Sequence, residues 1–174
     1  MNEALRKKIN DDIDEGFESE MLFLELIEKD GYYTKVATKS ENIYEHWDVA
    51  IFKDNILDYV DVKGLKEATA DGRTWVELQN VSGDIGWLYA PKLTIIAFEK
   101  EDCFELIKRV DLISVVEENI KKADVEDGGF TIYYDKTGLK DYRRYCRKNW
   151  GRDDRVVKVP FNDFQNLIFR RIFK

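Results

Sequence analysis

The sequence predicts a mixed α/β domain with one central sheet. Apolar residues recur every three or four positions from about Glu3 to Lys29, which is the pattern of an amphipathic helix. Residues 46–52 and 56–63 read as two strands joined by a turn over 53–55, which is typical of a β-hairpin. Residues 93–98 form a nearly continuous apolar run, as expected for a strand buried on both faces. Helices before and after a run of strands favour one sheet covered by helices.

Shorter patterns predict the remaining elements of a single domain over residues 1–174. Gly31 is a plausible end for the first helix. We expect further strands over 32–38, 74–81, 130–134 and 155–159, and helices over 103–110, 112–122 and 164–172. Asn162 and Asp163 can cap the last of these helices. The apolar stripe of the first helix consists of Leu5, Ile9, Ile13, Phe17, Met21 and Leu24.

Composition allows one folded domain and argues against several classes of protein. Of the 174 residues, 44% are hydrophobic and 36% charged, so the chain can bury a sizeable core. No apolar run approaches the roughly 20 residues that cross a bilayer, and the first residues lack the apolar stretch of a signal peptide. Cys103 and Cys146 have no C-x-x-C spacing, which argues against a zinc site and favours reduced thiols. We therefore expect a cytoplasmic protein with no membrane partner.

Charge is distributed unevenly along the chain, whose net charge is -7. Residues 136–174 contain 12 Lys or Arg and 4 Asp or Glu, whereas residues 1–135 contain 16 and 31. A basic C-terminal section on an acidic body can follow a phosphate backbone, although a solvated basic helix explains it equally well. The candidate nucleic-acid-binding residues are Arg143, Arg144, Arg147, Lys148 and Arg152. Arg143 with Arg147, and Arg144 with Lys148, have the spacing of pairs on one side of a helix.

The hairpin carries the residues that point to chemistry. Side chains alternate across a strand, so Asp61 and Lys63 share one face, and Asp48 lies in the strand expected to pair with theirs. Glu77 and Gln79 share a face of the next expected strand. If the three strands are neighbours, these five side chains converge.

Such a set suits the hydrolysis of a phosphodiester bond. Carboxylate oxygens are hard ligands that hold Mg²⁺ or Mn²⁺. The metal lowers the pKa of bound water and neutralises phosphate charge. A lysine beside the carboxylates can position the water or take its proton.

Asp48 followed by Asp61-Val62-Lys63 resembles the PD-(D/E)XK nuclease superfamily, and residues 42–98 carry the likeness. The stretches around Glu77 and 83–98 are also similar to small nuclease-like proteins met in bacteriophage genomes. The resemblance implies a central mixed four-stranded sheet flanked by helices, as in restriction endonucleases. It also implies metal-dependent cleavage of nucleic acid, for which we expect DNA, in the host cytoplasm if the chain is phage-encoded. Asp48 and Asp61 would be metal ligands, the Val62 carbonyl a third, and Lys63 the water-orienting residue or general base.

The resemblance also suggests accessory residues. Members often add an acidic residue from the first helix, and Glu20 is the best candidate because its spacing from Phe17 and Leu24 puts it on the apolar stripe. Glu77 and Gln79 would serve as an accessory ligand or as substrate contacts. His46 sits where a variant of the site could gain a ligand. The chain departs from the pattern at Trp47, which stands where a proline usually precedes the first aspartate.

Other interpretations remain open. A short D-x-K pattern also occurs on surface strands with alternating charges. The fold could serve as a catalytically inactive binding module that regulates or inhibits a protein partner, to which the acidic body could dock, or as a structural subunit of a larger complex. A homodimer is possible for a nuclease that cuts both strands. The aromatic residues that can stack on bases or simply pack in the core are Trp75, Trp87, Tyr89 and Trp150.

Overall fold

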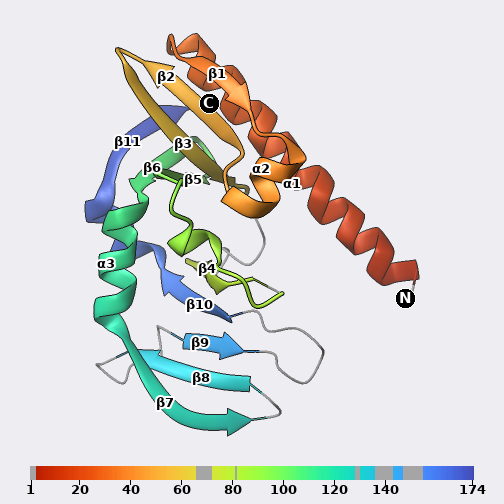
Figure 1. Ribbon diagram of the computed structural model, residues 1–174, viewed down its shortest axis with the longest axis vertical. Helices are drawn as coiled ribbons and strands as arrows, with labels where there is room; N and C mark the ends of the chain where they lie inside the picture. The colour runs from red at the N-terminus through yellow and green to blue at the C-terminus, as the bar shows by residue number, and fades with distance from the viewer. Residues whose placement is uncertain (1–2, 66–71, 81, 128–129, 136–142, 147–154) are drawn as a thin grey trace.

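The computed structural model describes residues 3–65, 72–80, 82–127, 130–135, 143–146 and 155–174 (Figure 1). In chain order, with η for 3-10 helices, the elements are α1 (Glu3–Lys29), β1 (Tyr33–Val36), α2 (Lys39–Glu45), β2 (Val49–Lys53), β3 (Ile56–Lys63), β4 (Arg73–Gln79), η2 (Trp87–Tyr89), β5 (Ile95–Glu99), β6 (Cys103–Lys108), α3 (Arg109–Asn119), β7 (Ile120–Asp127), β8 (Phe130–Asp135), β9 (Arg143–Cys146), β10 (Arg155–Pro160), η4 (Phe161–Leu167) and β11 (Ile168–Phe173). Within these ranges, no helix is long and apolar enough to cross a membrane.

The α/β fold is built on a six-stranded mixed sheet with the order β1-β2-β3-β5-β6-β11. Strands β3 and β5 pair in parallel, and the other neighbours pair antiparallel. A second, antiparallel sheet has the order β4-β10-β9-β8-β7 and lies at the opposite end of the molecule from β1 (Figure 1). The parallel pair sits in the middle of the larger sheet, where strands are covered on both faces.

The larger sheet separates two apolar clusters. On one face, Phe23 and Ile27 of α1 are fully buried with Val60 of β3 and Phe104 of β6. On the other face, a second cluster joins the sheet to β4, η2, α3 and η4, and its fully buried members include Trp47 and Ile96. Alternation along β3 therefore sends Val60 and Val62 toward α1 and Tyr59 toward the second cluster, which places Asp61 on the side of the second cluster.

The hairpin of β2 and β3 confirms the sequence prediction. The strands pair antiparallel from Val49 with Val60 to Lys53 with Ile56. Asp54 and Asn55 both have positive φ, 52° and 63°, which is the conformation of the two-residue turns that suit the twist of a hairpin. The register brings the start of β2 beside the end of β3.

Several predicted elements are wrong. The sheet has six strands instead of four. The strand predicted over 74–81 is present as β4, but it belongs to the second sheet, because β5 takes the place beside β3. The helices predicted over 103–110 and 164–172 are largely the strands β6 and β11, preceded in the second case by η4. A short apolar run is compatible with a helix or a strand. Here the backbone pairing of β6 with both β5 and β11 makes these segments strands.

The apolar stripe predicted for α1 is also only partly right. Phe17 and Met21 are 60% and 48% exposed, whereas Phe23, Leu24 and Ile27 form the buried face. The helix thus presents to the sheet a face rotated from the one that the sequence favoured. The helical spacing assumed for Arg143 and Arg144 is wrong as well, because both belong to strand β9.

Candidate active site

A pocket of about 440 Å³ lies where α1, α2, the end of β3 and β4 meet. Four sequence-predicted carboxylates and the predicted lysine line it together. The full lining is Gly16, Glu20, Asn42, His46, Asp48, Asp61, Val62, Lys63, Gly64, Thr74, Trp75, Glu77 and Trp87. The hairpin brings Asp48 and Asp61 side by side, and α1 and β4 add Glu20 and Glu77 from segments distant in sequence.

Asp48 is held firmly by its neighbours. Its Oδ2 accepts a hydrogen bond from the Val62 N–H at 2.7 Å, and its Oδ1 accepts one from the Asn42 side-chain amide. The Asp48 N–H donates to the Val60 carbonyl at 2.8 Å, which extends the pairing of β2 and β3 by one residue. A buried carboxylate with these partners has one fixed orientation.

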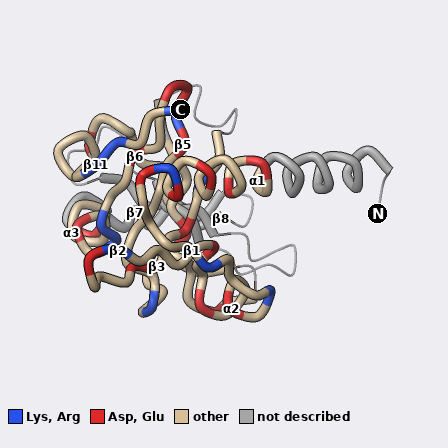
Figure 2. The backbone as a smooth tube through the Cα atoms, turned by 90° about the horizontal axis from the view of Figure 1, so that it is seen from above, with Lys and Arg blue, Asp and Glu red and all other residues tan. Residues whose placement is uncertain are grey.

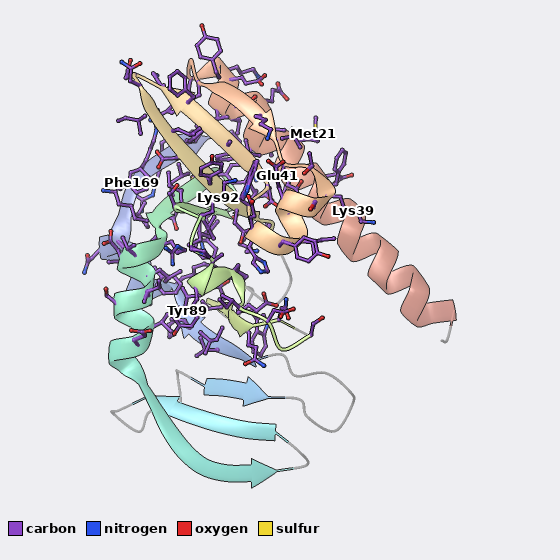
Figure 3. The ribbon with its side chains drawn as sticks, in the orientation of Figure 1. Met21, Lys39, Glu41, Tyr89, Lys92 and Phe169 are labelled. Atoms are coloured by element: carbon purple, nitrogen blue, oxygen red, sulfur yellow. The ribbon has the colours of Figure 1, made fainter. Side chains whose placement is uncertain are left out.

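Helix α2 positions Asn42. It begins with a capping box in which Thr38 and Glu41 exchange side-chain and backbone hydrogen bonds, and it ends at His46 in the left-handed region with φ 56°. The Lys92 ammonium donates to Glu45 at 2.6 Å and ties the end of α2 to the body. Figure 3 shows the labelled side chains of Lys39 and Glu41 on this helix. The capping box therefore stabilises the start of the short helix, and Lys92 anchors its end.

Asp61 and Lys63 form an ion pair inside the pocket. Lys63 Nζ lies 2.6 Å from Asp61 Oδ2, and the two side chains are 31% and 7% exposed. The ammonium also lies 5.0 Å from the centre of the Trp87 ring, a favourable cation–π distance. Asp61 Oδ2 is nevertheless buried without a hydrogen bond of normal geometry in the described part of the chain. The closest partner of this oxygen is therefore the Lys63 ammonium, held in an ion pair rather than in a well-aligned hydrogen bond.

Burial and mutual repulsion disturb the ionisation of these groups. Burial, and then the charge of Asp61, raises the pKa of Asp48 to about 7. Burial, followed by the charge of Asp48, raises the pKa of Glu20 to about 7. Burial also raises the pKa of Asp61 against the pull of Lys63. For Lys63, burial opposes the charged form, but Asp61 and Asp48 keep its pKa above the usual value. The pocket therefore holds more carboxyl groups than one lysine can neutralise, and without a further cation some of them keep their protons near neutral pH.

The donor set suits a hard divalent cation. In the described residues, no three side chains of His, Cys, Asp or Glu are already grouped closely enough to hold a metal ion. Mg²⁺ commonly takes only one or two protein carboxylates and fills its remaining positions with water and substrate phosphate. Asp61 and the adjacent Asp48, which line the same pocket, meet that requirement. Val62 also faces this site, since its N–H donates to Asp48.

Some predicted residues lie elsewhere. Gln79 does not line the pocket, because it lies at the far end of β4, where it forms a β-bridge with Ile85. Arg143 and Arg144 lie on β9, while Arg147, Lys148 and Arg152 lie outside the described residues. Among the candidate stacking residues, Trp75 lines the pocket and is 40% exposed, whereas Trp87 is 6% exposed.

Asn42 is a site residue that the sequence reasoning missed. The signal was present, since Thr38 and Glu41 mark a helix start just before it. Replacing Asn42 with alanine should lower Mn²⁺ affinity or metal-dependent activity by about 10- to 100-fold, because Asp48 loses the donor that orients it. Titration with Mn²⁺ would measure the change, and Asn166→Ala, at an exposed position, is the control. Equal affinity in the Asn42 variant and the control would contradict the assigned role.

Gly86 fixes the position of β4 and hence of Glu77. A Cβ atom at Gly86 would lie 2.6 Å from the Glu77 carbonyl oxygen and 2.7 Å from two other backbone atoms of β4. Gly86→Ala should therefore destabilise the protein by about 1–3 kcal/mol, since backbone must move. Chemical denaturation checks this, with Gly16→Ala as control because nothing lies within 4 Å of that position in α1. A Gly86 variant as stable as the Gly16 variant would contradict this packing.

Comparison with models of protein families, with curated proteins and with solved structures gave no match to this chain.

Proposed function

We propose that this protein is a metal-dependent endonuclease that hydrolyses phosphodiester bonds of DNA, with a site like that of the PD-(D/E)XK nucleases. The observation that carries the proposal is the single pocket that holds Asp48, Asp61 and Lys63 together with Glu20 and Glu77. Two acidic side chains next to a lysine, in a pocket with more carboxyl groups than that lysine can neutralise, suit a divalent cation and a phosphate group better than they suit a purely structural role.

Each residue has a distinct role in this proposal. Asp48, Asp61 and the Val62 carbonyl would hold Mg²⁺ or Mn²⁺, with Glu20 as a further ligand. The metal, when bound, would supply Lewis-acid activation of water and neutralisation of phosphate charge. Lys63 would orient the attacking water through its ammonium group, which Asp61 already fixes at 2.6 Å. Glu77 would contact substrate or metal-bound water from β4.

The proposal is tested by cleavage of labelled single- and double-stranded DNA and RNA in Mn²⁺, Mg²⁺ or chelator. We expect cutting of DNA that requires the metal and stops with chelator. Cutting that continues in chelator would contradict the metal-dependent mechanism, and an absence of cutting on every substrate would contradict nuclease activity.

A specific observation favours a second candidate, the catalytically inactive binding module. Asp48 already accepts two hydrogen bonds and Asp61 already pairs with Lys63, so much of the site is satisfied by the protein itself. A module of this kind would use its acidic body to dock on a basic protein partner. It should bind no Mn²⁺ at Asp48 and Asp61, which separates it from the nuclease.

The basic C-terminal section, residues 136–174, should bind the substrate backbone. Replacing Arg144 and Arg147 together with alanine is expected to weaken DNA binding and to flatten its salt dependence. Each lost phosphate contact lowers the slope of log affinity against log salt by about 0.7–0.9. Fluorescence anisotropy over a salt titration measures this slope, and the same slope in both proteins would refute the assignment.

A further inference from the structure

The candidate reacting groups are deeply placed. Asp48 and Asp61 are only 6% and 5% exposed, and the pocket above them measures about 440 Å³. Its walls come from segments distant in sequence: α1, α2 and the link that follows it, the end of β3, β4 and η2. This volume lies in the range of roughly 300–1,000 Å³ that is usual for small ligands. A nucleotide within a stacked duplex can enter such a pocket only by leaving the stack, which costs a few kcal/mol.

Charge around the pocket also opposes a duplex. The lining contains four carboxylates, Glu20, Asp48, Asp61 and Glu77, against one lysine. Acidic positions also mark α1 and α2, the two helices that contribute to the wall (Figure 2). Duplex DNA carries one negative charge per about 1.7 Å along its axis and is stiff, so it would bring several phosphates close to these carboxylates. An unpaired strand can place one phosphate in the pocket and turn its neighbours away.

Trp75 provides a surface for a base. It lies two residues before Glu77 on the same face of β4, it lines the pocket, and it is 40% exposed. Trp87 is 6% exposed and is covered by the Lys63 ammonium, so its ring serves the ion pair. Stacking of bases on exposed aromatic rings is favourable for every base and selects unpaired strands.

We propose that the pocket receives a single unpaired nucleotide, whose base stacks on Trp75 while its phosphate faces Asp61 and Lys63. The substrate is then single-stranded DNA or an unpaired end or flap, rather than continuous duplex. This assignment rests on the proposed function, because it takes nucleic acid as the ligand of the pocket.

Binding and cleavage together test the assignment with the full chain. The probes are an oligo-dT strand, an RNA strand of equal length and a blunt duplex, with Ca²⁺ for anisotropy and Mn²⁺ for cleavage. We expect at least about tenfold tighter binding of the DNA strand than of the duplex. Trp75→Ala should weaken binding of the strand about tenfold or more, whereas Trp75→Phe should keep most of it. Tyr33→Ala, which removes an exposed aromatic residue outside the pocket, is the matched control.

The outcomes separate this inference from the proposed function. Mn²⁺-dependent cutting of duplex as fast as single strands, or unchanged strand binding in Trp75→Ala, would overturn the unpaired-nucleotide assignment and leave the nuclease intact. Trp75-dependent strand binding without any cutting would support the assignment while the nuclease proposal fails. Preference for the RNA strand would overturn the choice of DNA. Melting curves of the variants show that a loss of binding is not a loss of folding.

Discussion

Replacing Asp61 with alanine is expected to reduce Mn²⁺-dependent cleavage by at least about 10³-fold while leaving the protein folded. Asp61 is 5% exposed, its Oδ2 lies 2.6 Å from the Lys63 ammonium, and that oxygen has no hydrogen bond of normal geometry in the described residues. The substitution removes a proposed metal ligand and the partner that fixes Lys63. The loss of a buried partner of Lys63 costs stability, but Asp48 remains beside the ammonium and still favours its charged form, so we expect a less stable but folded protein.

Initial cleavage rates and thermal melting of the two proteins provide the measurement. Glu101→Ala, which removes an exposed carboxylate between β5 and β6, is the matched control and should cut like the wild type. A folded Asp61→Ala protein with wild-type activity would end the catalytic assignment of this residue.

The metal-free protein should lose stability as the pH rises from about 5 to 8, and Asp48→Asn should remove much of that loss. The pKa of Asp48 is about 7 in the folded protein and 3.8 for an ordinary aspartate, so the folded state binds the proton more tightly. The resulting stabilisation is fully present below the unfolded pKa and disappears as the pH rises through 7. One pKa unit corresponds to about 1.4 kcal/mol, so the loss is on the order of a few kcal/mol.

Urea denaturation in chelator at several pH values compares the wild type with Asp48→Asn. Asparagine imitates the neutral carboxyl group and keeps an oxygen for the Val62 N–H, so the variant should be the more stable protein at pH 8. The pKa of Glu20 is also raised to about 7, so part of the loss of stability with rising pH remains in the variant. If the free energy of unfolding changed equally with pH in the two proteins, Asp48 would be ionised at little cost in the folded state, which would contradict this prediction.

Local features of the site could be predicted from the sequence. Alternation along one strand places Asp61 and Lys63 on the same face, and a two-residue turn at Asp54 and Asn55 sets the register that brings Asp48 beside them. Both depend on residues close together in the chain, where periodicity and turn chemistry determine the outcome. Glu20 could be placed on the first helix, although its presence in the pocket depends on how α1 packs.

Features that depend on distant partners could not be predicted in the same way. No local pattern in the sequence indicates that β5 pairs with β3. That pairing leaves β4, and with it Glu77, in the second sheet. Glu77 still reaches the pocket because Gly86 allows close contact with β4, whereas Gln79, two residues on, lies beyond it. The strands β6 and β11 resemble helices in their apolar spacing, and only their pairing within the sheet, β6 with β5 and β11 with β6, reveals them as strands.

Binding of Mn²⁺ to the metal-free protein tests the central claim most directly. Calorimetric titration near pH 8, where Asp48 is ionised, should show saturable binding by the wild type and none by the Asp48→Asn, Asp61→Asn double variant. Saturable binding that the double variant loses would place the metal at these two carboxylates. No binding by the folded wild type would contradict a metal centre in this pocket and would favour the inactive binding module.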